Sequence, residues 1–413
     1  MIRHINRVVL PIIPCNAGMS DGSQMRVLHV ISAMDPVWGG PINALIGLAE
    51  AQHDAGLQVA IATTWIQSDS PAAVEKLASK GIEIARIGPA KGKMRRHRQI
   101  IPQLQRLIAA SDVVHIHALY EDIQHQAARI ARQLNVPYLF RPCGMLTPWS
   151  LARHRLRKWM YMLLRLRHDL NHAAALNFTT QAECDAAAPL NLRVPNIIEP
   201  LGVDLCEFAN LPPRGSFRNR YPQLAGKRIV LFLGRIHPGK GLELLIPAFA
   251  QAQIPDAMLV IVGPDLQNFQ ATVESTIRQH NIVDRVIFTG MLRGPDRIAA
   301  LADADLFALP SYHENFGISV IEALAAGVPV IISDEVNVCR EIAAAQVGAV
   351  VPTKIEPLAI ELKRWISDDA LRAAAAARAK PFVQEHYNWA NIARRWVDHY
   401  VALAHQSPAR AGS

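Results

Sequence analysis

Short apolar runs alternate with amphipathic stretches along the chain from Met25 onward, and this alternation limits the fold more than any other feature. Amphipathic stretches such as Pro41–Ala55 and Gln99–Ala110 are typical of helices. Strands that alternate with helices imply a parallel sheet with helices on both faces. The strands expected in this first series are Arg26–Ser32, Val59–Thr64, Ile82–Ile87, Val113–His117, Tyr138–Arg141 and Ala175–Thr179.

A second series follows a segment rich in proline, glycine and arginine around Val203–Tyr221. At 413 residues the chain is long enough for two domains of about 200 residues each. We therefore predict an α/β protein with one doubly wound domain over 25–204, a second over 205–387, and a helix over 388–404 that packs back on the first. Two such sheets would place the carboxyl ends of their strands around one cleft. The strands expected in the second series are Arg228–Leu233, Met258–Val262, Val286–Phe288, Leu306–Leu309, Val330–Ile332 and Ala349–Val351.

The first 24 residues precede this pattern and loosely resemble a signal peptide, because two arginines come before the apolar run Val8–Pro14. The run is short and broken by Pro11 and Pro14, and no convincing cleavage site follows. We interpret residues 1–24 as a disordered extension, and a start codon assigned too early would explain it equally well.

Charge and cysteine usage narrow the class of protein. The formal net charge of +8 suits anionic ligands or an anionic membrane surface, whereas no nucleic-acid-binding module is recognisable. The five cysteines are scattered without metal-ligand spacing, which is typical of a cytoplasmic protein. No apolar run reaches the roughly 18 to 20 residues that span a bilayer.

The segment Ser311–Val330 contains the strongest candidate site. A polar loop follows the strand that ends at Pro310 and leads into a small-residue helix near Gly317, whose free amides form an anion site. Glu314 lies just before this helix and Glu322 lies inside it, so that both carboxylates can accept hydrogen bonds from hydroxyl groups. The alternative is a loop carboxylate and a solvated helix residue.

The segment Gly234–Gly241 follows a strand and nearly matches the phosphate loop G-x-x-x-x-G-K-[ST]. Gly241 replaces the hydroxyl residue that would bind magnesium, so the pattern predicts phosphate binding by Arg235 and Lys240 without that metal chemistry. The alternative is two solvated cations, which the helix dipole disfavours.

Two weaker features lie in the first domain. Gly39 and Gly40 let backbone amides approach a phosphate or sugar, although an ordinary tight turn is an equal alternative. His115 and His117 share one face of a strand, with His117 nearer its carboxyl end. Either can bond a hydroxyl or a phosphate, and a structural role is favoured for His115. No third ligand stands at a suitable spacing, so we expect no metal.

The segment 150–171 has the pattern of a basic amphipathic helix and is a candidate surface for anionic lipid. The alternative is a packed helix with a solvated basic face. Its basic residues are Arg153, His154, Arg155, Arg157, Lys158, Arg165, Arg167 and His168.

Together these segments resemble glycosyltransferase family 4 (glycosyl transferases group 1), a group of retaining enzymes with the GT-B fold. Glu314 and Glu322 match its E-x7-E motif, and Ala-Leu-Ala-Ala-Gly-Val-Pro-Val follows them. The resemblance implies two Rossmann-like domains that face a central cleft, the first binding the acceptor and the second the nucleotide sugar. The segment Arg141–Ser150 looks like the acceptor-side loop of members that build surface polysaccharides.

The resemblance also implies roles for particular residues. Arg235 and Lys240 would hold the donor diphosphate, Glu322 the ribose, and Glu314 would lie beside the transferred sugar. His117 matches the histidine of the family's cleft, with His115 as the competing assignment. The other donor-binding residues would be Gly39, Gly40, Gly263, Leu292, Asn315, Phe316, Gly317 and Ile318.

The implied activity is retaining, metal-independent sugar transfer from a nucleoside-diphosphate sugar to a glycan or lipid-linked acceptor, in surface polysaccharide synthesis. No cofactor is implied, and the expected location is the cytoplasm, at the inner face of the membrane. A catalytically silent GT-B scaffold and a sugar-nucleotide epimerase are the alternatives. The donor sugar, its base and the acceptor stay open.

Overall fold

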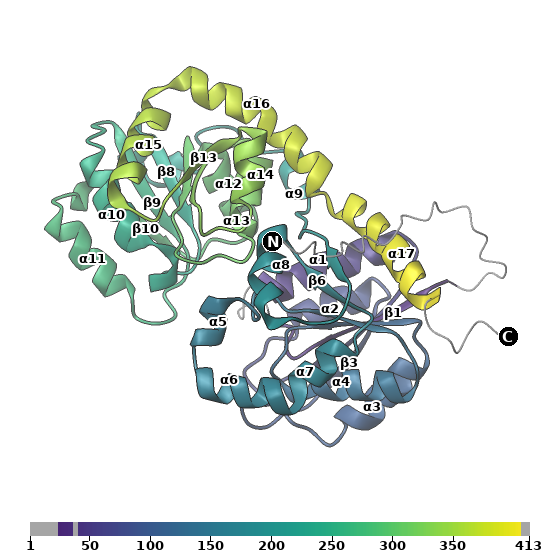
Figure 1. Ribbon diagram of the computed structural model, residues 1–413. Helices are drawn as coiled ribbons and strands as arrows, with labels where there is room; N and C mark the ends of the chain where they lie inside the picture. The colour runs from purple at the N-terminus through teal and green to yellow at the C-terminus, as the bar shows by residue number, and fades with distance from the viewer. Residues whose placement is uncertain (1–23, 36–39, 406–413) are drawn as a thin grey trace, which may run out of the picture. The chain divides into compact units, whose positions relative to one another are not determined.

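The computed structural model describes residues 24–35 and 40–405. It divides into one unit formed by Met1–Gly202 with Trp389–Ser413, and a second formed by Val203–Asn388. The extension expected over 1–24 lies outside the described residues except for its last residue, and Gly39 lies outside them as well. Figure 1 shows both units, each built around a sheet.

The first unit has a seven-stranded sheet in the order β3-β2-β1-β4-β5-β6-β7, and every pair of neighbouring strands is parallel. Its last strand, β7, adds to the six that the apolar runs predict. The strands are β1 (Arg26–Ile31), β2 (Gln58–Thr64), β3 (Glu83–Ile87), β4 (Val113–His117), β5 (Tyr138–Arg141), β6 (Ala175–Phe178) and β7 (Asn196–Ile198). Its helices are α1 (Gly40–Asp54), α2 (Ala72–Ser79), α3 (Ile100–Ala109), α4 (Asp122–Gln133), α5 (Pro148–Ala152), α6 (Arg155–Tyr161), α7 (Arg167–Asn171), α8 (Gln181–Ala187) and α17 (Trp389–His405).

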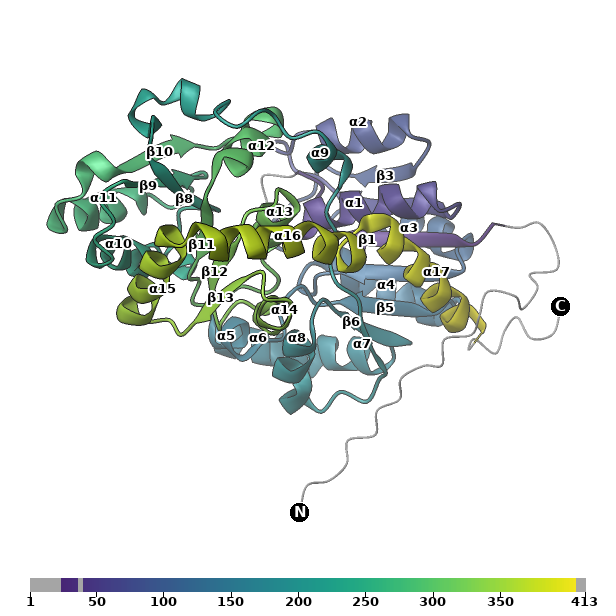
Figure 2. The same cartoon turned by 90° about the horizontal axis from the view of Figure 1, so that it is seen from above.

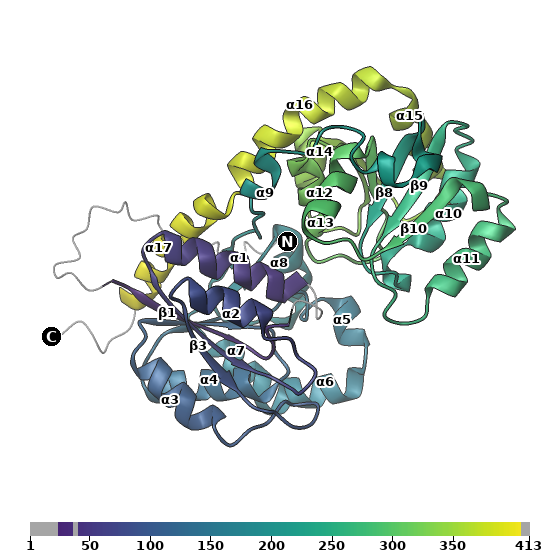
Figure 3. The same cartoon turned by 180° about the vertical axis from the view of Figure 1, so that it is seen from behind.

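Helices cover both faces of this sheet, because alternate residues of each strand point to opposite faces. Leu28 and Val30 of β1 face a core that includes α3 and α4, whereas Val27 and Ile31 face α1 and α17. Figures 2 and 3 show α1 and α17 side by side.

The C-terminal helix α17 docks through large side chains spaced three or four residues apart, including Trp396 and Tyr400. The indole of its first residue, Trp389, packs directly against the backbone of two glycines, Gly47 and Gly202. A Cβ at Gly47 would lie 2.4 Å from the indole Nε1 of Trp389, and one at Gly202 would lie 2.5 Å from its Cδ2. The helix α17 is therefore part of the first unit's core.

The second unit has a six-stranded parallel sheet in the order β10-β9-β8-β11-β12-β13. In both sheets the strand order reverses in the middle, between β1 and β4 and between β8 and β11. Doubly wound folds bind ligands beside the carboxyl ends of strands at this reversal. The strands are β8 (Arg228–Leu233), β9 (Ala257–Val262), β10 (Val286–Gly290), β11 (Leu306–Leu309), β12 (Val330–Ser333) and β13 (Gly348–Val351). The helices are α9 (Cys206–Ala209), α10 (Leu242–Gln251), α11 (Gln270–Gln279), α12 (Gly294–Asp303), α13 (Ile318–Ala325), α14 (Cys339–Ala345), α15 (Ile355–Ser367) and α16 (Asp369–His386).

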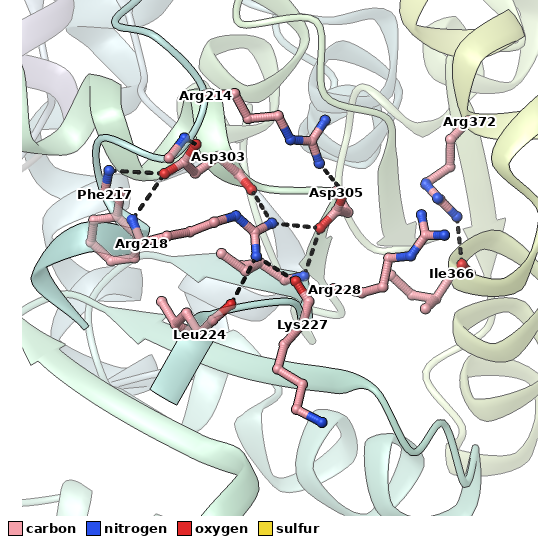
Figure 4. A network of polar contacts seen from close by, with 12 residues as sticks. Arg214, Phe217, Arg218, Leu224, Lys227, Arg228, Asp303, Asp305, Ile366 and Arg372 are labelled. Atoms are coloured by element: carbon pink, nitrogen blue, oxygen red, sulfur yellow. Dashed lines mark hydrogen bonds and ion pairs between the residues drawn. The ribbon is translucent and has the colours of Figure 1, made fainter. Parts of the chain in front are cut away.

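Two buried aspartates tie the arginine-rich segment that precedes β8 to the second sheet. Asp305 accepts a 3.0 Å ion pair from Arg218 and a 2.8 Å hydrogen bond from the backbone N–H of Ile229 in β8. The charges of this segment therefore have a structural role. Figure 4 shows that Asp303 accepts the backbone N–H groups of Phe217 and Arg218. The same carboxylate also accepts the backbone N–H of Gly215.

Candidate functional site

The loop after β8 carries Arg235, which is exposed, and Lys240, which is half-buried. It ends at Gly241, whose φ of +72° lies in the left-handed region. A Cβ at Gly241 would lie 1.9 Å from the carbonyl oxygen of Pro310 at the end of β11. Glycine at this position therefore allows the loops that follow β8 and β11 to touch.

The loop after β11 is held from both sides. The N–H of Tyr312 donates to Gly239 O at 3.1 Å, which joins it to the loop after β8. The N–H of Glu314 donates to Glu335 O at 3.0 Å, and the carbonyl of Glu314 accepts from Asn337 N at 3.0 Å. Both sides of the Glu314 backbone are thus fixed, which positions its carboxylate.

Lys240 and Glu314 form an ion pair between these two loops, although 74 positions separate them in the sequence. Their side chains are 18% and 19% exposed, so both charges are partly shielded from water and still accessible to a ligand. The structure thus brings together a cation and a carboxylate that the sequence assigned to separate motifs.

Glu322 projects from α13 and pairs with Arg297 of α12, which also contacts the carboxylate of Glu207. Burial raises the pKa of the Glu322 carboxyl, and the nearby Arg297 guanidinium opposes that rise. Sequence reasoning missed Arg297, because no motif marks it and it lies in another helix.

The helix α13 begins at Gly317, which has a φ of +83°. Ile318 is its first residue, and the first amides of a helix lack acceptors within it. Phe316 is 3% exposed and packs edge-on to Tyr387, with 5.8 Å between the ring centroids. Its buried side chain therefore anchors the loop to the core of the second unit. Asn315 is half-buried in the same loop.

Gly263 follows β9 and comes closer to the β8 loop than any side chain would allow, since a Cβ there would lie 1.8 Å from Gly234 O. Its N–H donates to Gly290 O at 2.9 Å, at the end of β10. Leu292 follows two residues later and is half-buried. The carboxyl ends of β10, β9, β8 and β11 therefore carry the predicted residues of the second unit.

In the first unit, Gly40 is the exposed first residue of α1, and His117 is the last residue of β4 with none of its surface exposed. The expectation that the histidine pair has no third partner is wrong. His29 of β1 lies beside it, with 2.9 Å between His29 Nδ1 and His117 Nε2. The spacing could not show this, because His29 stands 86 residues before His115 and meets it only through strand pairing.

These three histidines are fully buried and neutral. Burial lowers the pKa of His29 to about 4 and holds the pKa values of His115 and His117 well below the ordinary value, and the Arg141 guanidinium lowers all three further. One nitrogen from each ring lies within 4.8 Å of the others. The rings of His115 and His117 stack, with 4.2 Å between their centroids and 25° between their planes.

The segment 155–171 forms α6, a π-helical turn over Met162–Leu166, and α7. Its inner face, including Leu166 and Leu170, packs against the core. Its outer face carries the exposed arginines together with an apolar stripe that has helical spacing. The stripe consists of Leu156, Trp159, Met160, Leu163 and Leu164, exposed by 71%, 60%, 48%, 59% and 74%.

Two doubly wound parallel sheets, with charged loops at the reversal of the second, define a GT-B glycosyltransferase. A profile described as glycosyl transferases group 1 matches residues 214–382, and one described as a glycosyl transferase 4-like domain matches residues 39–198. The chain belongs to glycosyltransferase family 4, which confirms the resemblance seen in its motifs.

Among curated proteins, the chain is 27% identical over 398 residues to a phosphatidyl-myo-inositol mannosyltransferase of Mycolicibacterium smegmatis, a match that covers 92% of this chain and 94% of that one. It is 26% identical over 399 residues to a GDP-mannose:cellobiosyl-diphosphopolyprenol alpha-mannosyltransferase of Xanthomonas campestris, covering 92% and 97%. It is 33% identical over 189 residues to an uncharacterized glycosyltransferase of Methanocaldococcus jannaschii, covering 45% of this chain and 47% of that protein.

Solved structures confirm the predicted fold. HepE from Anabaena, in complex with UDP, superposes with a TM-score of 0.77 at 19% identity, covering 92% of this chain and all of that one. Sucrose-phosphate synthase from Thermosynechococcus elongatus superposes with a TM-score of 0.72 at 23% identity, covering 93% and 100%. Among the described residues, no helix is both long and apolar enough to cross a bilayer.

Proposed function

We propose that this glycosyltransferase moves a sugar from a nucleoside-diphosphate sugar to a glycan or lipid-linked acceptor, with retention of the anomeric configuration and without a metal. The observation that carries the proposal is the ion pair of Lys240 with Glu314 at the reversal between β8 and β11. A diphosphate needs cations there, whereas a sugar hydroxyl needs a carboxylate, and this site offers both side by side.

In this proposal Arg235 and Lys240 neutralise the diphosphate as it leaves, and the amides at the start of α13 add their dipole. Glu314 accepts hydrogen bonds from the transferred sugar, while Arg297 holds Glu322 ready for the ribose. The bond from the anomeric carbon to the phosphate oxygen breaks as the acceptor oxygen bonds to the same face. The acceptor's proton passes to the departing phosphate, so no carboxylate nucleophile is required.

The names of the relatives suggest the first substrates to test. Two curated relatives that match over most of their length are mannosyltransferases, and one of them uses GDP-mannose and a polyprenol-linked acceptor by name. GDP-mannose is therefore the first donor to test, with UDP-glucose for comparison.

We also propose that the apolar stripe on α6 and the following turn binds the anionic inner face of a membrane, where a lipid-linked acceptor for surface polysaccharide would lie. Leu156 and Leu164 are 71% and 74% exposed, which is unusual for leucine in such a continuous stripe. Arginines flank the stripe, as expected for a helix that lies in the interface of an anionic bilayer.

Donor binding and turnover test the main proposal. Thermal-shift measurements with nucleoside diphosphates and nucleotide sugars should single out one base, because a ligand of the folded state raises its stability. Nucleoside diphosphate should then be released only when acceptor is present, which excludes an epimerase or a silent scaffold. Arg235→Ala should weaken diphosphate binding and Glu314→Gln should reduce turnover. Normal activity of either variant would remove the corresponding assignment.

Sedimentation with phospholipid vesicles tests membrane binding. The variant carrying Leu156→Ser and Leu164→Ser should lose binding to vesicles that contain anionic lipid. Leu266→Ser is a matched control, since Leu266 is 56% exposed in the other unit. Equal sedimentation of all three proteins would contradict this proposal.

A further inference from the structure

A chain of buried hydrogen bonds links the C-terminal helix α17 to His117. Gln52 of α1 stands at its centre, with its Oε1 2.7 Å from His29 Nε2 and its Nε2 3.1 Å from the hydroxyl of Tyr400. The Tyr400 hydroxyl lies 2.8 Å from His115 Nδ1, and His29 Nδ1 lies 2.9 Å from His117 Nε2. All five side chains are fully buried.

The donor and acceptor roles along this chain follow from Gln52. Its Oε1 can only accept, so His29 Nε2 carries a proton. The neutral His29 ring has just one N–H, which makes its Nδ1 an acceptor. His117 must then donate from Nε2, and its own Nδ1 is left as a bare lone pair.

His117 Nδ1, His115 Nε2 and Arg141 Nε have no hydrogen-bond partner among residues 24–35 and 40–405. Of these residues, His117 and Arg141 stand at the ends of their strands. These two residues are paired across β4 and β5, at the carboxyl ends of both strands and on the same face. A buried acceptor without a partner destabilises the fold unless a ligand supplies the missing donor. The two orphaned atoms therefore mark where the fold expects a polar ligand.

We propose that Gln52, Tyr400 and His29 are positioning residues that hold His117 in its Nε2–H tautomer, so that Nδ1 accepts a hydrogen bond from a hydroxyl of a bound substrate. This inference rests on the proposed function, to which it adds a contact between His117 and that hydroxyl. In this chain the Tyr400 hydroxyl donates to His115 Nδ1 and therefore accepts from the NH2 group of Gln52, which leaves Gln52 Oε1 facing His29. Without the hydroxyl the Gln52 amide can rotate and reverse the donor and acceptor roles in the chain. The C-terminal helix thereby sets the hydrogen-bonding character of a residue at the edge of the sheet.

The tautomer can be measured directly by ¹⁵N NMR of the histidine rings, because protonated and bare ring nitrogens have distinct shifts. We expect wild-type His117 to carry its proton on Nε2. Gln52→Met removes both hydrogen bonds at similar side-chain volume, and Tyr400→Phe removes only the hydroxyl. Both variants should show a mixture of His117 tautomers. A wild-type protein with the proton on Nδ1 would overturn the proposal, even if neither variant folds.

Activity provides the second readout. The kcat/KM should fall about tenfold in both variants, as expected for one lost or misdirected hydrogen bond. Tyr138→Phe is the matched control, since it removes another buried hydroxyl of the same unit, bonded to Asp169 O at 2.7 Å. An equal fall in the control would make the effect one of stability and would overturn the proposal.

The variant His117→Ala separates the contact between His117 and a substrate from the positioning of His117 by the hydrogen-bond chain. If His117→Ala keeps full activity, the contact between His117 and a substrate hydroxyl is wrong, and the proposed role of the hydrogen-bond chain falls with it while the donor site of the second unit stands. If His117→Ala is inactive but Gln52→Met and Tyr400→Phe keep the wild-type tautomer and kcat/KM, only the positioning role of the hydrogen-bond chain is wrong.

Discussion

Acidification should destabilise the first unit through its three buried histidines. The folded protein keeps His29, His115 and His117 neutral, because burial lowers their pKa values from an ordinary 6.5, to about 4 for His29. The unfolded chain takes up these protons as the pH falls below 6.5, and the folded chain does not. The stabilising difference is therefore complete above pH 6.5 and is lost progressively toward about pH 4.

The magnitude follows from the size of the pKa shifts. One histidine that titrates only in the unfolded state contributes about 1.4 kcal/mol for each pH unit. Between the ordinary pKa of 6.5 and about pH 5, His29 alone should thus remove about 2 kcal/mol of unfolding free energy, and His115 and His117 add to this loss in the same direction. The loss from His29 alone is a considerable share of the roughly 5 to 15 kcal/mol that a domain possesses.

Urea unfolding at a series of pH values, followed by tryptophan fluorescence, measures this slope. Other groups titrate as well, so the informative quantity is the difference between wild type and His29→Asn, whose slope should be smaller by about 1.4 kcal/mol per pH unit. Tyr400→Phe breaks the same network without removing a histidine, so its stability should fall at every pH with the slope unchanged. Equal slopes for wild type and His29→Asn would refute the reasoning.

Three further variants test the second unit. Asp303→Ala should lower the unfolding free energy by about 3 kcal/mol in urea titrations, because three backbone N–H groups lose a charged acceptor. Gly241→Ala should weaken donor binding in thermal-shift assays, since its Cβ would meet a backbone oxygen at 1.9 Å; Gly226→Ala, with a φ of +69° and open space around it, should cost only backbone strain and leave binding intact. Arg297→Gln should raise the pKa of the Glu322 carboxyl further, so donor affinity should fall at a higher pH than in wild type as the pH is lowered, and an unchanged pH profile would contradict the ribose assignment.

Much of the fold could be predicted from the sequence because its signals are local. Strand runs such as Ile229–Leu233 and Leu306–Leu309 are apolar throughout, as is typical of strands covered on both faces. Strand β7 was missed because Asn196–Ile198 is three residues long and only its middle residue is buried. The motif around Glu314 was found for the same reason as the strands, since its spacing lies within one loop and one helix.

The partners of the predicted residues could not be found in this way. Arg297 pairs with Glu322 from another helix, and Tyr400 reaches His115 across 285 positions. Neither partner stands in a motif, and a lone arginine or tyrosine in an amphipathic helix is ordinary surface or core. Nothing in the order of residues separates these two from the other arginines and tyrosines of the chain.

The sequence by itself determined most of the residues that form strands and helices, and which short motifs stand at the strand ends. The tertiary structure alone decided which of those ends meet. Because the strand order reverses between β1 and β4 and between β8 and β11, His29 lies beside His115, and Lys240 reaches Glu314. Periodicity reports the environment of each residue along its own strand, whereas contacts between distant segments depend on the order in which the strands pair, and that order follows from the packing of the whole sheet.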